Sequence, residues 1–169
     1  GSPFGAGTNP AAVAVSPNSS FAYVANGGGD VSAYTINSST GVLSAVAGSP
    51  FGAGTNSSAV AVSPNGLFAL VTNLGSNNIS VYSINGSTGV LSAVAGSPFS
   101  VGTSPTGVSV SPNGSFVYVA NQGSNNVSAF TINNTTGALT AVAGSPFSAG
   151  TSPAGVTVSP NGSFLYVAN

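Results

Sequence analysis

Short runs of alternating apolar residues, separated by polar turns, recur along the whole chain. In the third repeat these runs are "GVSVSP" at 107–112, "SFVYVAN" at 115–121, "VSAFTIN" at 127–133 and "ALTAVA" at 138–143. The words "PNG", "QGSNN" and "NTTG" between them supply residues that favour tight turns. No window shows the 3.6-residue periodicity of an amphipathic helix. The pattern therefore predicts four short antiparallel strands per repeat, followed by a longer connection.

The repeat is regular in length. The word "GSPF" begins at positions 1, 48, 96 and 144, and the words "FAYVAN", "FALVTN", "FVYVAN" and "FLYVAN" begin at 21, 68, 116 and 164. A period in the high forties with four strands in each unit is typical of a β-propeller blade.

The strands predicted at the centre of each repeat are apolar on both faces. Successive side chains of a strand point to opposite faces, and both sets in the second strand are large and apolar: Phe116 and Tyr118, and Val117 and Val119. This favours a sheet covered on both sides by its neighbours. The first strand carries small residues between its valines, as suits a crowded innermost strand: Ala14, Ala61, Ser109 and Thr157.

The fold class predicted is an all-β propeller of four-stranded antiparallel blades, with about three and a half blades in a single repeat domain, 1–169. The blades are expected at approximately 10–47, 58–95 and 106–143, with a half blade at 154–169. A membrane β-barrel and a β-helix are the alternative architectures. A barrel would favour aromatic girdles and longer strands, and a β-helix would favour shorter rungs.

The words "SPNG-F-YVAN", "GSNNVSAFTIN" and "TGALTAVAGSPF" resemble the YVTN-type propeller repeat and, more widely, the lactonase-like seven-bladed propellers. The resemblance covers the whole chain, and its words are structural rather than catalytic. It implies four-stranded blades, often seven to a ring, and often a location outside the cytoplasm. Known enzymes of this kind act on sugar lactones and use polar and charged residues at the mouth of the channel.

Charged side chains are almost absent. They make up 1% of the sequence, against about 25% in a typical soluble domain, and Asp30 is the only one. Without Lys or Arg the chain lacks the groups that bind nucleic acids or anionic membrane surfaces. No apolar stretch approaches the ~18 to 20 residues of a membrane helix. Residue 1 is Gly rather than Met, so we expect a processed, cropped or recombinant piece of a longer protein.

The composition argues against catalysis. One carboxylate without His, Lys or a second acid makes a poor general acid–base system, and a serine nucleophile would lack a base. The chain has no Cys or His to ligate zinc, and one carboxylate makes a tight calcium site unfavourable. Asp30 stands where later repeats have Asn78 and Asn126, which favours a turn role. We therefore expect no enzyme activity, no catalytic residues, no cofactor and no metal.

Recurring aromatic and asparagine positions are the remaining candidates for binding. The aromatic positions are predicted to fill the space between blades, with sugar stacking as the alternative: Phe4, Phe51, Phe99 and Phe147; Tyr23, Tyr118 and Tyr166, with Leu70 in the same position; Tyr34, Tyr82 and Phe130. The asparagines at strand ends are predicted to cap turns, with a glycan-binding ring or ladders between subunits as alternatives: Asn26, Asn73, Asn121 and Asn169; Asn37, Asn85 and Asn133.

Two kinds of surface site follow from the sequence. N-glycosylation triplets occur at Asn18, Asn37, Asn56, Asn78, Asn85, Asn113, Asn126, Asn133, Asn134 and Asn161, although a chain so rich in Asn, Ser and Thr also forms such triplets by chance. A predicted assembly edge consists of Phe164, Leu165, Tyr166, Val167, Ala168 and Asn169, because an unguarded strand edge recruits other strands.

The function predicted from these observations is that of a non-enzymatic, extracellular or cell-surface structural protein that self-assembles into a ring or filament. Its expected partners are copies of itself, with glycans or cell-surface proteins as further candidates. One alternative is a carbohydrate- or protein-binding propeller module. Another is a fragment of a lactonase-like enzyme that lacks its active centre.

Overall fold

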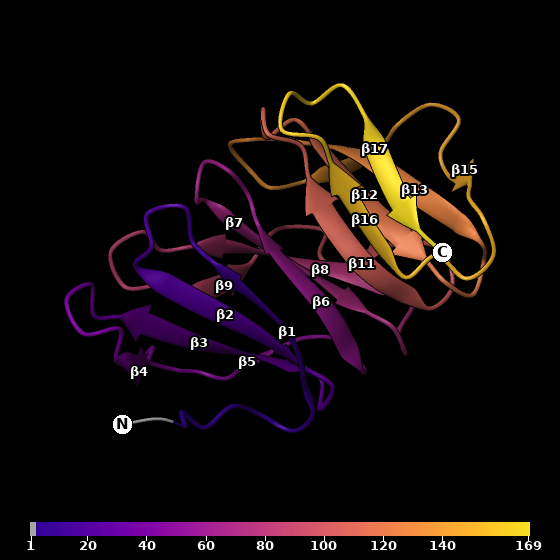
Figure 1. The fold of residues 1–169 in the computed structure, drawn as a ribbon. Helices are drawn as coiled ribbons and strands as arrows, with labels where there is room; N and C mark the ends of the chain where they lie inside the picture. Colours follow the sequence, from indigo (N-terminus) through magenta and orange to yellow (C-terminus); the bar gives the residue numbers. More distant parts are fainter. Residues whose placement is uncertain (1–2) are drawn as a thin grey trace.

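The structure is a computed structural model that describes residues 3–169, and Figure 1 shows its sheets in succession along the chain. The first blade contains β1 (Pro10–Val15), β2 (Phe21–Asn26), β3 (Asp30–Ile36), β4 (Leu43–Ala45) and β5 (Phe51–Gly52). The second blade contains β6 (Ser57–Val62), β7 (Phe68–Asn73), β8 (Asn78–Ile84), β9 (Leu91–Ala93) and β10 (Phe99–Ser100).

The third blade contains β11 (Pro105–Val110), β12 (Phe116–Asn121), β13 (Asn126–Ile132), β14 (Leu139–Ala141) and β15 (Phe147–Ser148). A two-stranded half-blade follows, made of β16 (Gly155–Val158) and β17 (Leu165–Ala168). All pairings are antiparallel, and residues 3–169 contain no helix. The all-β propeller fold predicted from the sequence is confirmed.

Each full blade adds one short strand to the four that the sequence predicts. The fourth strand is interrupted: β4 pairs with the end of β3, and the two-residue β5 pairs with its start. The serine of the "GSPF" word fills the break, because Ser49 Oγ accepts the Ala33 N–H at 2.9 Å. Ser97 and Ser145 do the same for the second and third blades. The segment predicted as a plain connection is therefore part of the sheet.

The first strand of each blade lies next to the first strand of the following blade. β1 contacts β6, β6 contacts β11, and β11 contacts β16, so these strands form the innermost layer of the propeller. The small residues predicted for this layer allow a close approach. A Cβ on Gly107 would lie 3.1 Å from the Cα of Gly155.

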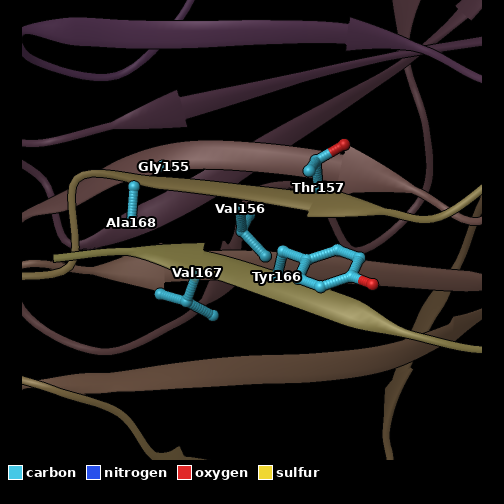
Figure 2. Close-up of a pocket in the computed structure, with 6 residues that line it drawn as sticks. All are labelled: Gly155, Val156, Thr157, Tyr166, Val167 and Ala168. Carbon is cyan, nitrogen blue, oxygen red and sulfur yellow. The ribbon is translucent and has the colours of Figure 1, made fainter.

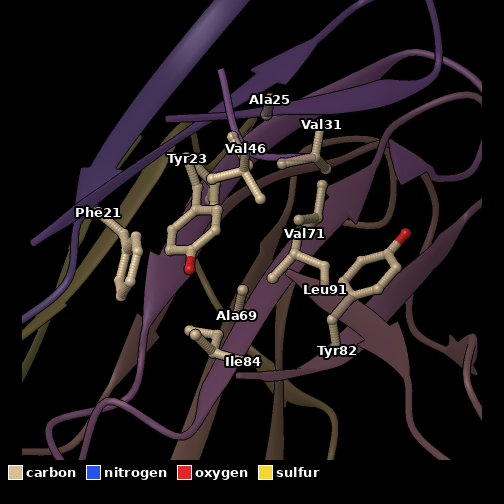
Figure 3. Packing of buried hydrophobic residues seen from close by; sticks show 12 residues of the cluster. Phe21, Tyr23, Ala25, Val31, Val46, Ala69, Val71, Tyr82, Ile84 and Leu91 are labelled. Atoms are coloured by element: carbon tan, nitrogen blue, oxygen red, sulfur yellow. The ribbon is translucent and has the colours of Figure 1, made fainter. Parts of the chain in front are cut away.

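Apolar side chains fill the space between consecutive blades. Figure 3 shows the first of these layers, in which Phe21 and Tyr23 of the first blade meet Val71 and Ile84 of the second. Tyr23 is fully buried, and its hydroxyl donates to the backbone carbonyl of Gly89 at 3.1 Å. A second layer joins the second and third blades around these residues: Phe68, Leu70, Ile79, Val81, Val117, Val119 and Phe130.

The predicted packing role of the aromatic positions holds for most of them. Five of the eleven positions are buried: Tyr23, Leu70, Tyr34, Tyr82 and Phe130. Phe51 and Phe99 are partly buried and pack against the first and second apolar layers. Phe147 and Phe4 are exposed, as are Phe164 and Tyr166 of the half-blade. No helix within residues 3–169 has the length and apolar character needed to cross a membrane.

Candidate functional site

One end of the blades gathers polar backbone and side-chain groups close to the innermost strands. β1 and β2 run antiparallel with Pro10 opposite Asn26, so the start of the first strand and the end of the second lie together. The same pairing joins Ser57 to Asn73 and Pro105 to Asn121. We call this end the rim: the segments before β1, β6 and β11 and the turns 26–30, 73–78 and 121–126.

A buried asparagine anchors each rim turn. In the first blade, Asn26 Nδ2 donates to Asp30 Oδ1 at 2.6 Å and to Ser32 Oγ at 2.9 Å. Ser32 Oγ also accepts the Gly7 N–H at 3.2 Å. These bonds fix the position of Asp30, the only charged side chain of the protein.

The same arrangement recurs with an amide in place of the carboxylate. Asn73 Nδ2 donates to Asn78 Oδ1 at 2.7 Å and to Ser80 Oγ at 2.9 Å. Asn121 does so with Asn126 at 2.8 Å and Ser128 at 2.9 Å. These three asparagines were predicted to cap turns through the backbone, and the structure instead shows side-chain networks.

A glycine lies against each anchoring asparagine and leaves no room for a side chain. A Cβ on Gly7 would lie 2.5 Å from Asn26 Nδ2, and a Cβ on Gly54 would lie 2.7 Å from Asn73 Cγ. The glycine of the "GSPF-GAGT" connection is therefore the residue that allows the next segment of backbone to cover the network.

The Oδ1 atoms of the three buried asparagines differ in whether they accept a hydrogen bond. Asn73 Oδ1 accepts a hydrogen bond from Ser57 Oγ at 3.0 Å. Asn26 Oδ1 and Asn121 Oδ1 are buried without a hydrogen-bond partner among the described residues. The residues that stand in the place of Ser57 are Pro10 and Pro105, which have no hydroxyl to donate.

Two further asparagines bind neighbouring blades together at the rim. Asn77 Oδ1 accepts the Ser104 N–H at 2.8 Å, and Asn125 Oδ1 accepts the Ser152 N–H at 2.7 Å. Both asparagines adopt a left-handed backbone with φ of 54°, a conformation that asparagine tolerates better than most residues. The first blade has Gly29 at this place, so its turn lacks the amide.

Chemically, the rim offers one carboxylate surrounded by hydroxyl and amide groups. Such groups can donate to and accept from the hydroxyls and ring oxygens of a sugar. Within residues 3–169 there is no group of three or more His, Cys, Asp or Glu that could hold a metal ion. Asp30 would need a partner acid or base to perform proton transfer.

The predicted glycosylation triplets fall at two different ends of the blades. Six lie in exposed turns opposite the rim, where each asparagine Oδ1 accepts the N–H two residues ahead: Asn18, Asn37, Asn85, Asn113, Asn133 and Asn161. For Asn37, Asn85 and Asn133 this geometry confirms the predicted turn capping. Asn134 lies in the same turn as Asn133, whereas Asn56, Asn78 and Asn126 lie at the rim. Their modification stays a prediction.

The predicted assembly edge lies on the half-blade. Phe164, Leu165 and Tyr166 are exposed there, with Val167 partly buried and Ala168 and Asn169 exposed. Its role in assembly stays a prediction. The sequence reasoning did not identify Ser32, Ser57, Ser80 and Ser128 as parts of a site, because single serines in a serine-rich chain carry no distinguishing signal.

The chain matches the family described as lactonase, seven-bladed β-propeller, over residues 45–146, which is more than half of its length. No curated protein matches it.

Solved structures with the same fold include three bacterial proteins. A candidate 6-phosphogluconolactonase of Bacteroides uniformis is 22% identical, with a TM-score of 0.81 over 98% of this chain and 45% of that protein. A functionally unknown protein of Desulfotomaculum acetoxidans is 23% identical, with a TM-score of 0.80 over 97% and 50%. The periplasmic gluconolactonase of Pseudomonas aeruginosa is 23% identical, with a TM-score of 0.76 over 96% and 43%. The chain therefore spans about half the length of these structures.

The prediction that the chain is not an enzyme is wrong at the level of its family. The matched family is one of lactonases, and two of the similar structures carry lactonase names. The prediction treated the composition of this chain as the composition of a complete active centre. A site at the mouth of a propeller is built from loops of many blades, so a half ring poor in catalytic side chains does not decide the class of the whole.

The blade architecture, the repeat length and the family match agree. The chain belongs to the lactonase family of seven-bladed β-propellers.

Proposed function

We propose that this chain forms part of a lactonase-like propeller enzyme, in which its rim contributes Asp30 and a set of fixed amides and hydroxyls to a sugar-lactone site. The supporting observation is that a hydrogen bond from Asn26 holds Asp30 at the end of the blades where the innermost strands begin. Further blades would supply the remaining catalytic and binding groups. This is the fragment alternative derived from the sequence, and it replaces the structural-protein interpretation.

The reaction in question is hydrolysis of a cyclic ester. Water adds to the lactone carbonyl, the ring C–O bond breaks, and the product is an open-chain hydroxy acid. The rim groups would orient the sugar through hydrogen bonds, and Asp30 would accept a hydrogen bond from a sugar hydroxyl or from the attacking water. The His, Lys, Arg and Glu side chains that assist such steps are absent from this sequence and would come from other blades.

The absence of Arg and Lys side chains bears on which part of a sugar lactone this chain can contact. A phosphorylated sugar is normally held by Arg, Lys or backbone N–H clusters, and this chain has no Arg or Lys. The part of the site that this chain forms would therefore contact the uncharged hydroxyls of the sugar lactone rather than a phosphate group.

The test is lactone opening by the complete polypeptide encoded with these repeats. Acid release from gluconolactone is followed with a pH indicator and compared with the spontaneous rate. Asp30→Asn should lower kcat/KM by roughly tenfold or more, because a charged hydrogen-bond acceptor becomes a neutral one. Asn37→Ala, in a turn at the opposite end, is the control and should leave the rate unchanged. Hydrolysis at the spontaneous rate, or an unaltered Asp30→Asn enzyme, would refute the proposal.

Two finer assignments accompany this proposal. The repeat words support a YVTN-type repeat within the wider family, and the name of the Pseudomonas neighbour supports a location outside the cytoplasm. Fractionation of cells that express the tagged polypeptide tests the location. Recovery of the protein only from the cytoplasm would contradict it.

A further inference from the structure

Turns that contain an Asn-Gly pair carry a reactivity of their own. The hollow of about 410 Å³ in Figure 2 offers only two hydroxyl side chains among glycine and apolar residues: Gly155, Val156, Thr157, Tyr166, Val167 and Ala168. An asparagine followed by glycine needs no such partner, because the glycine nitrogen carries no neighbouring Cβ and can approach the side-chain amide. The sequence has five such pairs: Asn26-Gly27, Asn65-Gly66, Asn85-Gly86, Asn113-Gly114 and Asn161-Gly162.

Four of the five pairs have a glycine N–H that is already bonded. In each of them it donates to a backbone carbonyl at 2.8 Å: Gly27 to Asn9, Gly66 to Ser63, Gly114 to Ser111 and Gly162 to Ser159. Asn26 is also fully buried. In these turns the nitrogen has to give up its hydrogen bond before it can attack the asparagine.

The fifth pair, Asn85-Gly86, lies in the turn between β8 and β9 and is free of this constraint. The Gly86 N–H has no acceptor within residues 3–169. Both residues are exposed, and a Cβ on Gly86 would meet no described atom within 4 Å. The Gly86 nitrogen is therefore open to solvent bases and free to move towards the asparagine side chain.

The same turn holds the Asn85 amide in place for attack. Asn85 Oδ1 accepts the N–H of Ser87 at 3.0 Å and of Thr88 at 3.1 Å. These bonds close a ring that contains Gly86 and so keep Asn85 Cγ near the Gly86 nitrogen. Two N–H donors on one oxygen also stabilise the negative charge that forms there when a nucleophile adds to the carbonyl carbon.

The equivalent turns of the other blades lack the glycine. Asn37 and Asn133 accept the same two N–H groups as Asn85 does. They are followed by Ser38 and Asn134, and a Cβ at this place hinders the approach of the nitrogen. Only Asn85 combines a free N–H, a bound carbonyl and a following glycine.

We propose that Asn85 is a site of spontaneous modification, at which the Gly86 nitrogen closes a succinimide ring that opens to aspartate or isoaspartate. The Gly86 N–H gives its proton to water or hydroxide, the bond from nitrogen to Asn85 Cγ forms, and the Cγ–Nδ2 bond breaks with release of ammonia. Water then opens the ring on either side of its nitrogen. The net reaction consumes one water and replaces the amide with a carboxylate, and it is independent of lactonase activity.

The turn that is modified also belongs to the joint between the first and second blades. The Asn85 carbonyl accepts the Gly89 N–H at 2.8 Å. Gly89 lies against the Phe21 ring, and its carbonyl accepts the Tyr23 hydroxyl at 3.1 Å. Isoaspartate leads the main chain through the former side chain and displaces the Asn85 carbonyl, so it should loosen this joint. Aspartate keeps the original backbone and should not.

The first test compares the Asn-Gly pairs within one molecule. The complete polypeptide encoded with these repeats is kept folded in mildly alkaline buffer, and samples taken over time are digested with pepsin, since this chain has no Lys or Arg for trypsin. Mass spectrometry should show Asn85 converting roughly five- to tenfold faster than Asn65 and Asn113, the factor expected for one turn hydrogen bond. In guanidinium chloride the three rates should become similar. Equal rates in the folded protein, or an unreacted Asn85, would overturn the proposal.

Two substitutions exchange the turns of the first and second blades. Gly86→Ser gives the second blade the turn sequence of the first, and Gly86 lacks a positive φ, so serine suits its backbone. Conversion of Asn85 should then fall to background. Ser38→Gly is the reciprocal change and should make Asn37 react about as fast as Asn85. A reactive Gly86→Ser protein or an unreactive Asn37 would show that the turn does not control the reaction.

A third comparison separates the backbone change from the new charge. The isoaspartate form is isolated from the aged protein by ion-exchange chromatography, and Asn85→Asp is the matched control because it carries the same charge on a normal backbone. The isoaspartate form should unfold at a lower urea midpoint than Asn85→Asp. Identical midpoints would refute the proposed effect on the joint at Gly89.

Discussion

Asn73 uses both halves of its buried amide, whereas Asn26 and Asn121 use only the NH₂ group. The difference traces to one position, where Ser57 donates a hydrogen bond and Pro10 and Pro105 cannot. A buried acceptor without a partner costs about 1 to 3 kcal/mol, so the first and third blades carry a cost that the second avoids. The proline offsets part of it, because a rigid residue lowers the entropy of the unfolded chain.

Tyr23 is the side chain whose ionisation should matter most to folding. Burial raises the pKa of Tyr23 to about 12 and also raises the pKa of Tyr82, which a hydrogen bond with Ser80 partly counteracts. A raised folded pKa means that the stabilisation is complete below the unfolded value of about 10 and is lost as the pH rises towards 12. The chain has no Lys or Arg to titrate in the same range.

We predict that the free energy of unfolding falls by about 2 kcal/mol or more between pH 10 and pH 12. Tyr23→Phe should be about 1 kcal/mol less stable at neutral pH, through loss of the bond to Gly89, but should lose less stability in alkali. Urea unfolding followed by circular dichroism at each pH measures both effects. Tyr166→Phe, at an exposed ring, is the control. An alkaline loss of the same size in Tyr23→Phe would contradict the assignment.

At the residue level, the sequence identified the asparagines that could form structural hydrogen bonds, but not which of them are buried or what they contact. It predicted turn capping for Asn37, Asn85 and Asn133 correctly, because that interaction is local. It could not show that Asn26 and Asn73 are buried under Gly7 and Gly54, because that contact joins segments about twenty residues apart. Asp30 was predicted as a turn residue, and its bond to Asn26 agrees with that role.

Among the elements, the close approach of β11 and β16 involves two glycines, of which only Gly107 would place a Cβ against the neighbouring strand. A Cβ on Gly107 would meet backbone atoms of the neighbouring strand: Gly155 Cα at 3.1 Å, Ala154 O at 3.3 Å and Val156 N at 3.3 Å. A Cβ on Gly155 would meet no described atom within 4 Å. Neither glycine has a positive φ, so alanine is compatible with both backbones.

We predict that Gly107→Ala lowers the free energy of unfolding by about 1 to 3 kcal/mol, because β16 must move away from β11. Gly155→Ala should be neutral or slightly stabilising, since it only restricts the unfolded chain. Thermal unfolding of the two variants, at a concentration where the chain is monomeric, gives the comparison. Similar melting temperatures for the two would show that β16 is not held against β11.

The strands were predictable to within about two residues where their pattern was long enough. The expected strands at 115–121 and 127–133 are β12 (Phe116–Asn121) and β13 (Asn126–Ile132). The two-residue strands such as β15 were missed, because two residues show no periodicity. Ser145 also takes the place of a ladder partner at the break, which no backbone pattern reveals.

For the whole molecule, packing between blades and uncharged hydrogen bonds carry the stability. Asp30 is the only charged side chain, and the blades are joined by apolar layers and by amide bonds such as those of Asn77 and Asn125. Surface ion pairs, which respond to salt, are therefore replaced by interactions that do not.

We predict that the stability of the folded chain depends little on ionic strength or on mild acid. The free energy of unfolding should change by less than about 0.5 kcal/mol between about 0.01 M and 0.15 M NaCl, since no pair of charged side chains exists to be screened. Acid unfolding normally arises from many carboxylates that take up protons on unfolding, and this sequence has one such side chain. Urea midpoints measured at neutral and mildly acidic pH, at both salt concentrations, provide the comparison. A steep acid transition in the unmodified chain would contradict the prediction.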